Sequence, residues 1–233
     1  MSTPAFWLVI PAAGIGSRMQ ADCPKQYLKV SGKTILELTL ACFLKHPSLR
    51  GIVLALAEHD RWWPQSSLAK HPLIQSVVGG AERADSVLNA LQALQSHGAQ
   101  ADDWVLVHDA ARPLLAREDL DRLLAGLANH PVGGLLAVPA RDTLKQVDAE
   151  GSVLKTIDRS VIWHALTPQM FRLGLLQRAL TDALQSGVVV TDESSAVEWA
   201  GFTPKVIEGC ANNIKITRPE DLRLLNTLLL SAR

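Results

Sequence analysis

The sequence contains few cysteines and no excess of charge of either sign. Its 233 residues include three cysteines, Cys23, Cys42 and Cys210, and none belongs to a Cys-x-x-Cys pair. A zinc site built from thiolates is therefore not expected. The 23 basic and 23 acidic side chains give a formal net charge of +0, whereas a surface that coats nucleic acid normally carries a basic excess. We expect no nucleic-acid partner, although a local cluster of cations facing a small anion is compatible with this balance.

Long hydrophobic runs are also missing. The first apolar run, Phe6 to Ile10, is too short to span a membrane, and no basic residue precedes it as in a secretory leader. An odd number of cysteines is typical of proteins whose thiols stay reduced. We therefore expect a cytoplasmic location and no membrane partner.

The residues that are present have the composition of an ordinary globular protein, with 48% hydrophobic and 20% charged residues. Short apolar runs alternate with segments of helical periodicity. We expect strands at 6–10, 51–57, 74–78, 104–109, 133–139, 205–207 and 214–216. We expect helices at 34–46, 84–94, 117–129, 172–186 and 192–200, and a last one launched by a capping box at 217–220.

Strands that alternate with helices predict an α/β fold with a mostly parallel, Rossmann-like sheet and helices on both faces. The segment 141–160 differs, because it is charged and alternates apolar with polar residues. This pattern predicts a β-hairpin with its turn near Ala149-Glu-Gly151. We expect a single domain over residues 1–233, from which this arm protrudes and pairs with another subunit.

The stretch after the first strand has the composition of an anion-binding loop. Pro11 ends the strand, and Gly14 and Gly16 allow backbone N–H groups to approach an anion closely. Two cations follow, Arg18 and Lys25. A tight strand-to-helix turn with two solvated cations would have the same composition, so these residues alone leave both interpretations open.

Neither of the two common phosphate-binding loops fits this stretch. A Walker A loop requires Gly-Lys-Ser/Thr, and here Gly16 is followed by Ser17-Arg18. A dinucleotide-binding fingerprint requires a small residue where Met19 stands. A Rossmann dehydrogenase is also disfavoured because the second strand ends without a clear ribose-binding acid; Glu58 is the nearest candidate.

Polar segments follow two further predicted strands, Gly79-Gly80 after the third and Asp109-Ala-Ala-Arg112 after the fourth. Ligands of parallel sheets bind beyond the carboxyl ends of the strands, so these segments and the first loop are expected to form one polyphosphate site. Asp109 could ligate Mg²⁺, bind a substrate hydroxyl or cap a helix. His108 is expected to pack rather than to react.

The opening motif, Pro11-Ala-Ala-Gly-Ile-Gly-Ser-Arg18 with Pro24-Lys-Gln-Tyr27, resembles that of nucleotidyltransferases that use a nucleoside triphosphate. Further stretches narrow the resemblance: Gly79-Gly-Ala-Glu-Arg-Ala-Asp-Ser-Val87, Val107-His-Asp-Ala-Ala-Arg-Pro113, Pro139-Ala-Arg-Asp-Thr143, Asp158-Arg159, Ala165-Leu-Thr-Pro-Gln169, Thr191-Asp-Glu193 and Asn213-Ile-Lys-Ile-Thr-Arg-Pro-Glu-Asp221. In this order, and over nearly the whole chain, they resemble the 2-C-methyl-D-erythritol 4-phosphate cytidylyltransferases of the non-mevalonate isoprenoid pathway.

The resemblance implies transfer of CMP from CTP to methylerythritol phosphate with release of pyrophosphate. One phosphate attacks the α-phosphorus of another, so the enzyme must neutralise and align two anions. It needs no general base, because the attacking phosphate is already ionised. The resemblance also implies Mg²⁺ as cofactor and a homodimer with exchanged arms. A cytidylyltransferase for another alditol phosphate, such as ribitol 5-phosphate, and a nucleotide-binding regulator without turnover remain as alternatives.

The resemblance also assigns roles to individual residues of this chain. The implied catalytic cations are Arg18, Lys25, Arg159 and Lys215. The implied nucleotide contacts are Ala12, Ala13, Gly14, Gly80 and Ser86. The implied contacts to the second substrate are Asp109, Arg112, Thr143, Thr167 and Thr191, with Asp109 as the candidate metal ligand. Arg159 and Thr143 lie on the predicted arm and are expected to complete the site of the partner subunit. Without the resemblance, Lys215 would be taken for an exposed edge-strand lysine.

Overall fold

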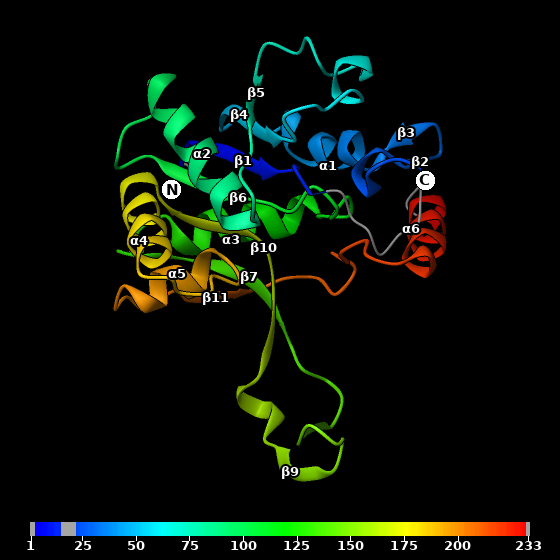
Figure 1. The fold of residues 1–233 in the computed structure, drawn as a ribbon, viewed down its shortest axis with the longest axis vertical. Coiled ribbons are helices and arrows are strands. Elements are labelled where there is room, and N and C mark those ends of the chain that lie inside the picture. Colours follow the sequence, from blue (N-terminus) through cyan, green and yellow to red (C-terminus); the bar gives the residue numbers. More distant parts are fainter. Residues whose placement is uncertain (1–2, 15–21, 232–233) are drawn as a thin grey trace.

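The computed structural model describes residues 3–14 and 22–231 of the chain. At its centre is a seven-stranded sheet made of β1 (Phe6–Pro11), β4 (Leu49–Leu56), β5 (Ile74–Val78), β6 (Trp104–Val107), β7 (Gly133–Pro139), β10 (Trp163–Arg172) and β11 (Lys205–Glu208). Their order across the sheet is β11-β7-β10-β6-β1-β4-β5 (Figure 1). All neighbouring strands are parallel except that β10 runs antiparallel to β6 and β7. The predicted mostly parallel α/β sheet is confirmed.

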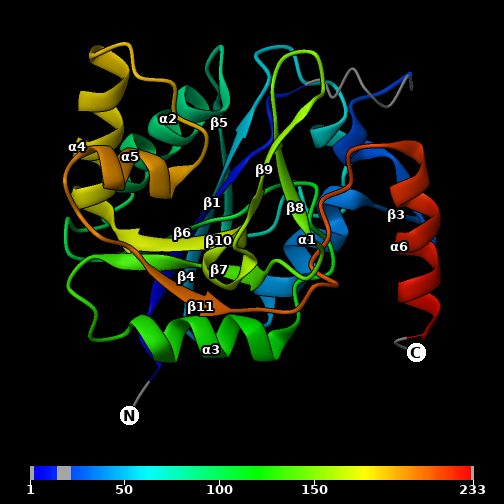
Figure 2. The same cartoon turned by 90° about the horizontal axis from the view of Figure 1, so that it is seen from below.

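Six α-helices accompany this sheet in the described part of the chain: α1 (Ile35–Leu44), α2 (Arg83–Ser96), α3 (Arg117–Leu127), α4 (Leu173–Gln185), α5 (Glu193–Trp199) and α6 (Pro219–Ser231). None of them has the length and apolar character needed to cross a membrane. Figure 2 shows α3 on one side of the sheet and α2, α4 and α5 on the other. The helices therefore cover both faces, as the alternating pattern predicted.

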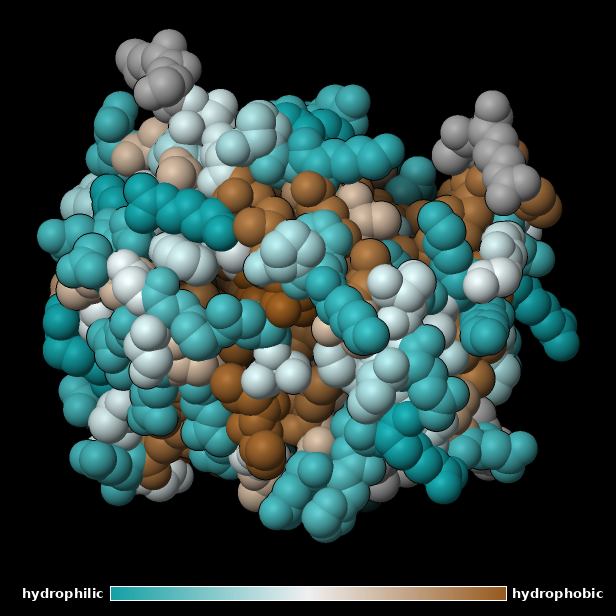
Figure 3. Space-filling model, turned by 90° about the horizontal axis from the view of Figure 1, so that it is seen from above, coloured by the Kyte–Doolittle hydropathy of each residue, from teal (hydrophilic) through white to brown (hydrophobic). Residues whose placement is uncertain are grey.

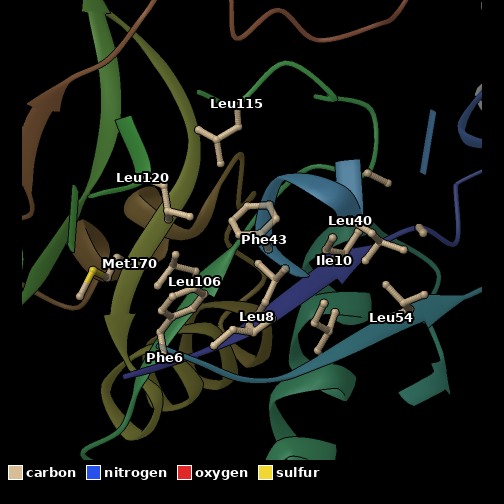
Figure 4. Packing of buried hydrophobic residues seen from close by; sticks show 14 of the residues in the cluster. Phe6, Leu8, Ile10, Leu40, Phe43, Leu54, Leu106, Leu115, Leu120 and Met170 are labelled. Carbon is tan, nitrogen blue, oxygen red and sulfur yellow. The ribbon is translucent and has the colours of Figure 1, made fainter. Parts of the chain in front are cut away.

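Strand β1 divides its side chains between two apolar clusters on opposite faces of the sheet, because successive residues of a strand point in opposite directions. Phe6, Leu8 and Ile10 join the cluster that contains α1 and α3, whereas Val9 joins the cluster that contains α2, α4 and α5. Figure 4 shows Phe43 of α1 beside Leu8 of β1. Each buried Leu, Ile or Phe stabilises the fold by about 1.5–3 kcal/mol relative to an exposed one. This burial makes β1 a rigid support for the loop that follows it.

Strand β10 was not predicted from the sequence. Its pairing with β7 is irregular between Ala165 and Gln169, where Pro168 has no N–H to donate to the ladder. The segment also lacks the apolar continuity of the parallel strands. As a result, β10 enters the middle of the sheet with a local break, and polar side chains lie in that break.

The predicted strand at 214–216 is wrong. Ile216 N–H donates one backbone hydrogen bond, of 2.8 Å, to Ala111 O, but residues 214–216 form no strand ladder. The predicted capping box of the last helix is also wrong in detail. The Asp221 carboxylate, rather than Glu220, accepts hydrogen bonds from the N–H groups of Thr217 and Arg218. The box at Thr34 and Glu37, by contrast, is present as predicted.

Smaller elements complete the fold. These are β2 (Lys29–Val30), β3 (Lys33–Thr34) and the short 3₁₀ turns η2 (Lys25–Tyr27), η3 (Trp63–Gln65) and η4 (Arg159–Val161). Leu225 of α6 packs with Val30, Ile35 and Ala111 in a third apolar cluster. The last helix is therefore docked beside the first part of the chain, which brings the 213–217 segment close to the loop after β1.

The predicted arm is confirmed as a hairpin of β8 (Leu144–Val147) and β9 (Val153–Ile157), which form a separate two-stranded sheet. Gly151 has a φ of 88° in its turn, a left-handed conformation that favours glycine. The hairpin projects from the body of the molecule (Figure 1). Its exposed apolar side chains include Val147, Val153 and Leu154.

The opposite side of the molecule, where edge strand β5 and residues 57–73 lie, has a mostly hydrophilic surface with apolar groups in a central hollow (Figure 3). Val78 of β5 is 55% exposed there. The strand has five residues, and short, polar-flanked strands are the usual form of an exposed sheet edge.

Candidate active site

A pocket opens where β1 and β6 end, which we call the β1 pocket. It has a volume of about 270 Å³. It is lined by residues 11–14 at the end of β1 and beyond it, 25–26 of η2, 80–83 and Ser86 before and in α2, 109–111 after β6, and Lys215. A second pocket, the β10 pocket, has a volume of about 300 Å³. It is lined by the break in β10 and by residues 191–192.

The two pockets adjoin and share three charged residues, Arg83, Asp109 and Lys215. A cleft of this kind, beyond the carboxyl ends of parallel strands, is the usual ligand site of an open α/β sheet. The predicted convergence of the loops after the first, third and fourth strands is therefore observed in the described part of the chain.

Gln26 holds the end of β1 in place. Its side-chain amide donates hydrogen bonds to Ala12 O at 2.7 Å and Gly14 O at 3.1 Å, and the residue is buried. Satisfying these carbonyls fixes the course of the backbone that lines the β1 pocket. Gln26 was not among the site residues expected from the sequence, although it stands directly after Lys25 in the motif Pro24-Lys-Gln-Tyr27.

The glycine pair before α2 lies close to the same pocket, and Gly80 lines it. Gly80 N–H donates a 3.0 Å hydrogen bond to Ser86 Oγ, which in turn donates to Glu82 O. A Cβ at Gly79 would lie 2.6 Å from Ala13 Cβ, and one at Gly80 would collide with Asp85. Glycine is therefore required for this approach, and Ser86 serves the pocket by fixing the loop.

Asp109 lies at the boundary of the two pockets and is surrounded by cations. Its Oδ1 accepts from Arg83 Nε at 3.2 Å, and its Oδ2 accepts from Lys215 Nζ at 2.9 Å and Arg112 Nε at 3.3 Å. Burial by itself raises the pKa of the Asp109 carboxyl, but attraction to these cations outweighs it and holds the pKa far below its ordinary range. Asp109 is therefore ionised at neutral pH.

Arg83 joins Asp109 to a second buried carboxylate. Its two terminal nitrogens donate to the oxygens of Glu193 at 2.7 and 3.0 Å, which is the paired geometry that favours arginine over lysine. Burial lowers the pKa of Arg83, but the two carboxylates reverse this effect and raise it above the ordinary value. Arg83 and Glu193 belong to the family-like motifs at 79–87 and 191–193 but were not among the expected site residues. Because 110 positions separate them, the sequence gives no sign that they pair.

Arg112, His108 and Thr167 form the support behind Asp109. Thr167 Oγ1 accepts from Asp109 N–H at 3.1 Å and bonds His108 Nδ1 at 3.0 Å, while His108 Nε2 bonds Arg112 O. Since a carbonyl oxygen only accepts, Nε2 carries the ring proton. Burial lowers the pKa of His108 to about 4, so the ring is neutral, and it packs edge-on against Phe43 as expected. The Thr167 hydroxyl is thereby engaged within the protein.

Two of the predicted catalytic cations meet at the β1 pocket. Lys25 Nζ donates to Ile216 O at 3.0 Å, and Lys215, whose side chain is 40% exposed, reaches Asp109. Both line the pocket although they come from opposite ends of the chain. Arg18 lies outside the described residues. Among the described residues, three cationic and two carboxylate side chains line each pocket, which leaves one net positive charge in each and suits an anionic ligand.

The arm residues lie outside both pockets of this chain. Arg159 donates from Nη1 to Arg141 O, and Arg159 and Thr143 are both exposed. Thr191, which is also exposed, lines the β10 pocket. The roles predicted for these residues therefore stay predictions.

The described residues contain no group of three or more His, Cys, Asp or Glu side chains that could hold a metal ion by themselves. Asp109 is the carboxylate that both pockets share. Mg²⁺ in phosphoryl-transfer sites is bound mainly by waters and substrate phosphates, with one or two carboxylates. Asp109 fits such an ion if one of its cations turns to a substrate phosphate.

Comparison with known proteins gives a consistent result. The family model of 2-C-methyl-D-erythritol 4-phosphate cytidylyltransferase matches residues 6–231. The chain is 65% identical over 224 residues to the protein of that name from Pseudomonas fluorescens, covering 96% of this chain and 95% of the relative. It is 67% identical over 219 residues to the Pseudomonas aeruginosa protein of that name, covering 94% of each.

Solved structures of proteins with this name also share the fold. The Francisella tularensis protein is 41% identical with a TM-score of 0.83, covering 96% of this chain and 99% of that one. The Thermus thermophilus protein is 32% identical with a TM-score of 0.75, covering 96% and 98%. Since the family model spans nearly the whole sequence and the fold and cleft agree with it, this chain belongs to the 2-C-methyl-D-erythritol 4-phosphate cytidylyltransferase family.

Proposed function

We propose that the two adjoining pockets bind the two substrates of the family reaction and that their shared cations promote it. The chain is a cytidylyltransferase that transfers CMP from CTP to 2-C-methyl-D-erythritol 4-phosphate, releases pyrophosphate, and acts in isoprenoid biosynthesis. The observation that carries the assignment of the pockets is that Lys215 and Asp109 line both of them. A reaction that joins two phosphates needs its charged groups at such a boundary.

The β1 pocket suits the nucleotide. Lys25 and Lys215 face it and would neutralise the triphosphate, with Arg18 expected beside them. Charge builds up on the departing pyrophosphate, so fixed cations stabilise the transition state more than the ground state. The backbone of Ala12, Ala13, Gly14 and Gly80 supplies close walls without large side chains, which favours the smaller cytosine over a purine.

The β10 pocket suits the acceptor phosphate. Arg112, Lys215 and Thr191 line it and would orient the attacking oxygen toward the α-phosphorus. We expect Arg159 and Thr143 of a second subunit to complete this pocket, because in their own chain they project on the exposed arm away from it. The protein would then act as a homodimer in which residues 141–160 form the exchanged arm of a single domain.

Mg²⁺ is the cofactor that this assignment requires. When bound, the ion would neutralise phosphate charge and hold the triphosphate in one geometry. Asp109 is the residue that would contribute to holding it. A cytoplasmic location, expected from the cysteine content, stays a prediction.

The test is a pyrophosphate-release assay with CTP, Mg²⁺ and methylerythritol phosphate. We expect turnover with this pair, and little with UTP in place of CTP or ribitol 5-phosphate in place of the acceptor. Faster turnover with ribitol 5-phosphate would reassign the acceptor pocket. CTP binding without pyrophosphate release would indicate a nucleotide-binding regulator instead.

A further inference from the structure

Four charged side chains form a continuous line from the start of α5 to the boundary of the two pockets. Glu193 binds Arg83 through two hydrogen bonds, Arg83 binds Asp109 Oδ1, and Asp109 Oδ2 binds Lys215. The members come from four separate parts of the chain. The exposed fraction of the side chains is 1% for Glu193, 30% for Arg83, 9% for Asp109 and 40% for Lys215, so the line has a buried end at Glu193 and an exposed end at Lys215.

We propose that Arg83 and Glu193 are positioning residues that fix the Asp109 carboxylate and, through it, the Nζ of Lys215 at the boundary between the two pockets. This inference deepens the proposed function and rests on it. Neither residue needs to contact a substrate for this role. It accounts for the close pairing of an arginine that lines both pockets with a buried glutamate.

The geometry of Arg83 leaves little freedom. Its Nε faces Asp109 and both terminal nitrogens face Glu193, so the planar guanidinium is held along two edges. Glu193 is itself anchored, because both of its neighbours in the chain are tied to β10: Gln169 donates to Asp192 Oδ2 at 2.8 Å and accepts from Ser194 N–H at 2.7 Å. The fixed end of the line is therefore the buried one.

Lys215 needs such an anchor. A lysine ammonium is a point charge on a flexible four-carbon stem, and an exposed lysine gains rotamer entropy when it is released. Asp109 is held on its other side by Arg83 and through its N–H by Thr167. Without Arg83 the carboxylate would lose its Oδ1 partner and keep only Arg112 and Lys215 on Oδ2, so it could turn about that oxygen and move the ammonium with it. A displacement of about 1 Å in a group that aligns reactants can lower a rate by about a hundredfold.

The alternative is that Arg83 contacts a substrate phosphate directly, since it lines both pockets. The two roles differ in their dependence on Glu193. A direct contact needs only the guanidinium, so Glu193→Gln would leave activity unchanged or higher. A positioning role needs the pair, so Glu193→Gln and Arg83→Lys would cause the same loss, and the double variant would lose little more.

The experiment is a double-mutant cycle between Arg83→Lys and Lys215→Ala, with kcat/KM for pyrophosphate release and CTP affinity by calorimetry as the two readouts. We expect Arg83→Lys and Glu193→Gln each to lower kcat/KM by about tenfold or more in the wild-type background. In the Lys215→Ala background, Arg83→Lys should lower kcat/KM by less than about threefold further, because the ammonium that Arg83 positions is already missing. The same coupling should appear in CTP affinity.

The matched control is the exposed pair of Arg117 and Asp121, 2.9 Å apart on α3, where Arg117→Lys should leave both readouts unchanged. Thermal unfolding checks that each variant is folded. If Glu193→Gln does not fold, the cycle between Arg83→Lys and Lys215→Ala is the test. Equal losses in both Lys215 backgrounds, or an unaffected Glu193→Gln enzyme, would overturn the positioning role. Coupled losses in CTP affinity without any turnover of the wild type would overturn the proposed function and leave the positioning role standing.

Discussion

Lys25 and Lys215 approach one pocket from the two ends of the chain, and neither is buried. We predict that Lys25→Ala and Lys215→Ala each lower kcat by about 10²–10³-fold, the usual cost of losing one group that stabilises transition-state charge. Steady-state pyrophosphate release measures the effect, and circular dichroism checks the fold.

The matched control for these variants is Lys70→Ala, at an exposed lysine outside both pockets. It should retain full activity. Turnover within threefold of wild type in both pocket variants would remove these lysines from the mechanism.

His108 gives the protein a dependence of stability on pH. Burial lowers its pKa in the folded state to about 4, whereas an unfolded histidine titrates near 6.5. Between these pH values the histidine is protonated in the unfolded chain but not in the folded one. The contribution of His108 to the free energy of unfolding is therefore at its maximum above pH 6.5 and falls as the pH drops toward 4. The contribution at stake is about 3 kcal/mol.

Urea unfolding at pH 7 and pH 5 measures this effect. We expect a clear loss of stability at pH 5 in the wild type and a smaller loss in His108→Gln, which starts from a lower value because it disturbs the bonds to Thr167 and Arg112. His164→Gln, at an exposed position, should keep the wild-type pH dependence. An unchanged slope in His108→Gln would refute the assignment.

At the scale of elements, the turn between β5 and α2 is so close to its neighbours that it has no room for a Cβ at Gly79 or Gly80. We predict that Gly80→Ala raises the KM for CTP by about tenfold, because relieving the collision with Asp85 must shift the wall of the β1 pocket. The fold should survive, since the turn is at the surface of the cleft. Steady-state kinetics with varied CTP measures the change.

Gly209→Ala is the matched control, because a Cβ at that position meets its neighbours at 3.4 Å or more and Gly209 lies outside both pockets. Its KM for CTP should equal that of the wild type. A Gly80→Ala enzyme with normal KM would show that this wall does not contact the nucleotide.

Most elements could be predicted because their periodicity is local. The strands at 74–78 and 133–139 begin and end where the apolar runs do, and the hairpin turns at the predicted glycine. Strand β10 was not predicted because it pairs with β6 and β7, which are distant from it in the sequence, and because its own residues include Pro168. For the same reason residues 214–216 have a strand-like composition but find no ladder to join.

At the scale of the whole molecule, the proposed exchange of arms would decide how the sites are completed. If Arg159 serves the partner's site, mixing inactive Lys25→Ala and Arg159→Ala subunits will restore activity. Random exchange of subunits makes about half of the dimers heterodimers, and each heterodimer has one intact site of its two. The mixture should therefore show about a quarter of the wild-type activity. Activity of the mixture after subunit exchange measures this, together with mass in solution.

Mixing Lys25→Ala with Lys215→Ala provides the control, because both lesions then lie in the same body and no intact site can form. A mixture of Lys25→Ala and Arg159→Ala that stays inactive, or a fully active monomer, would exclude the shared site.

The sequence by itself determined most strands and helices, the arm, and the family, because periodicity and the spacing of motifs are local properties of the chain; β10 and residues 214–216 are the exceptions. It also indicated Lys25, Asp109 and Lys215 as members of one site. Only the tertiary structure decided that Arg83 and Glu193 join that site and that Gln26 supports it. The partners of these side chains lie up to 110 residues away, and they meet only because the sheet places distant strand ends side by side.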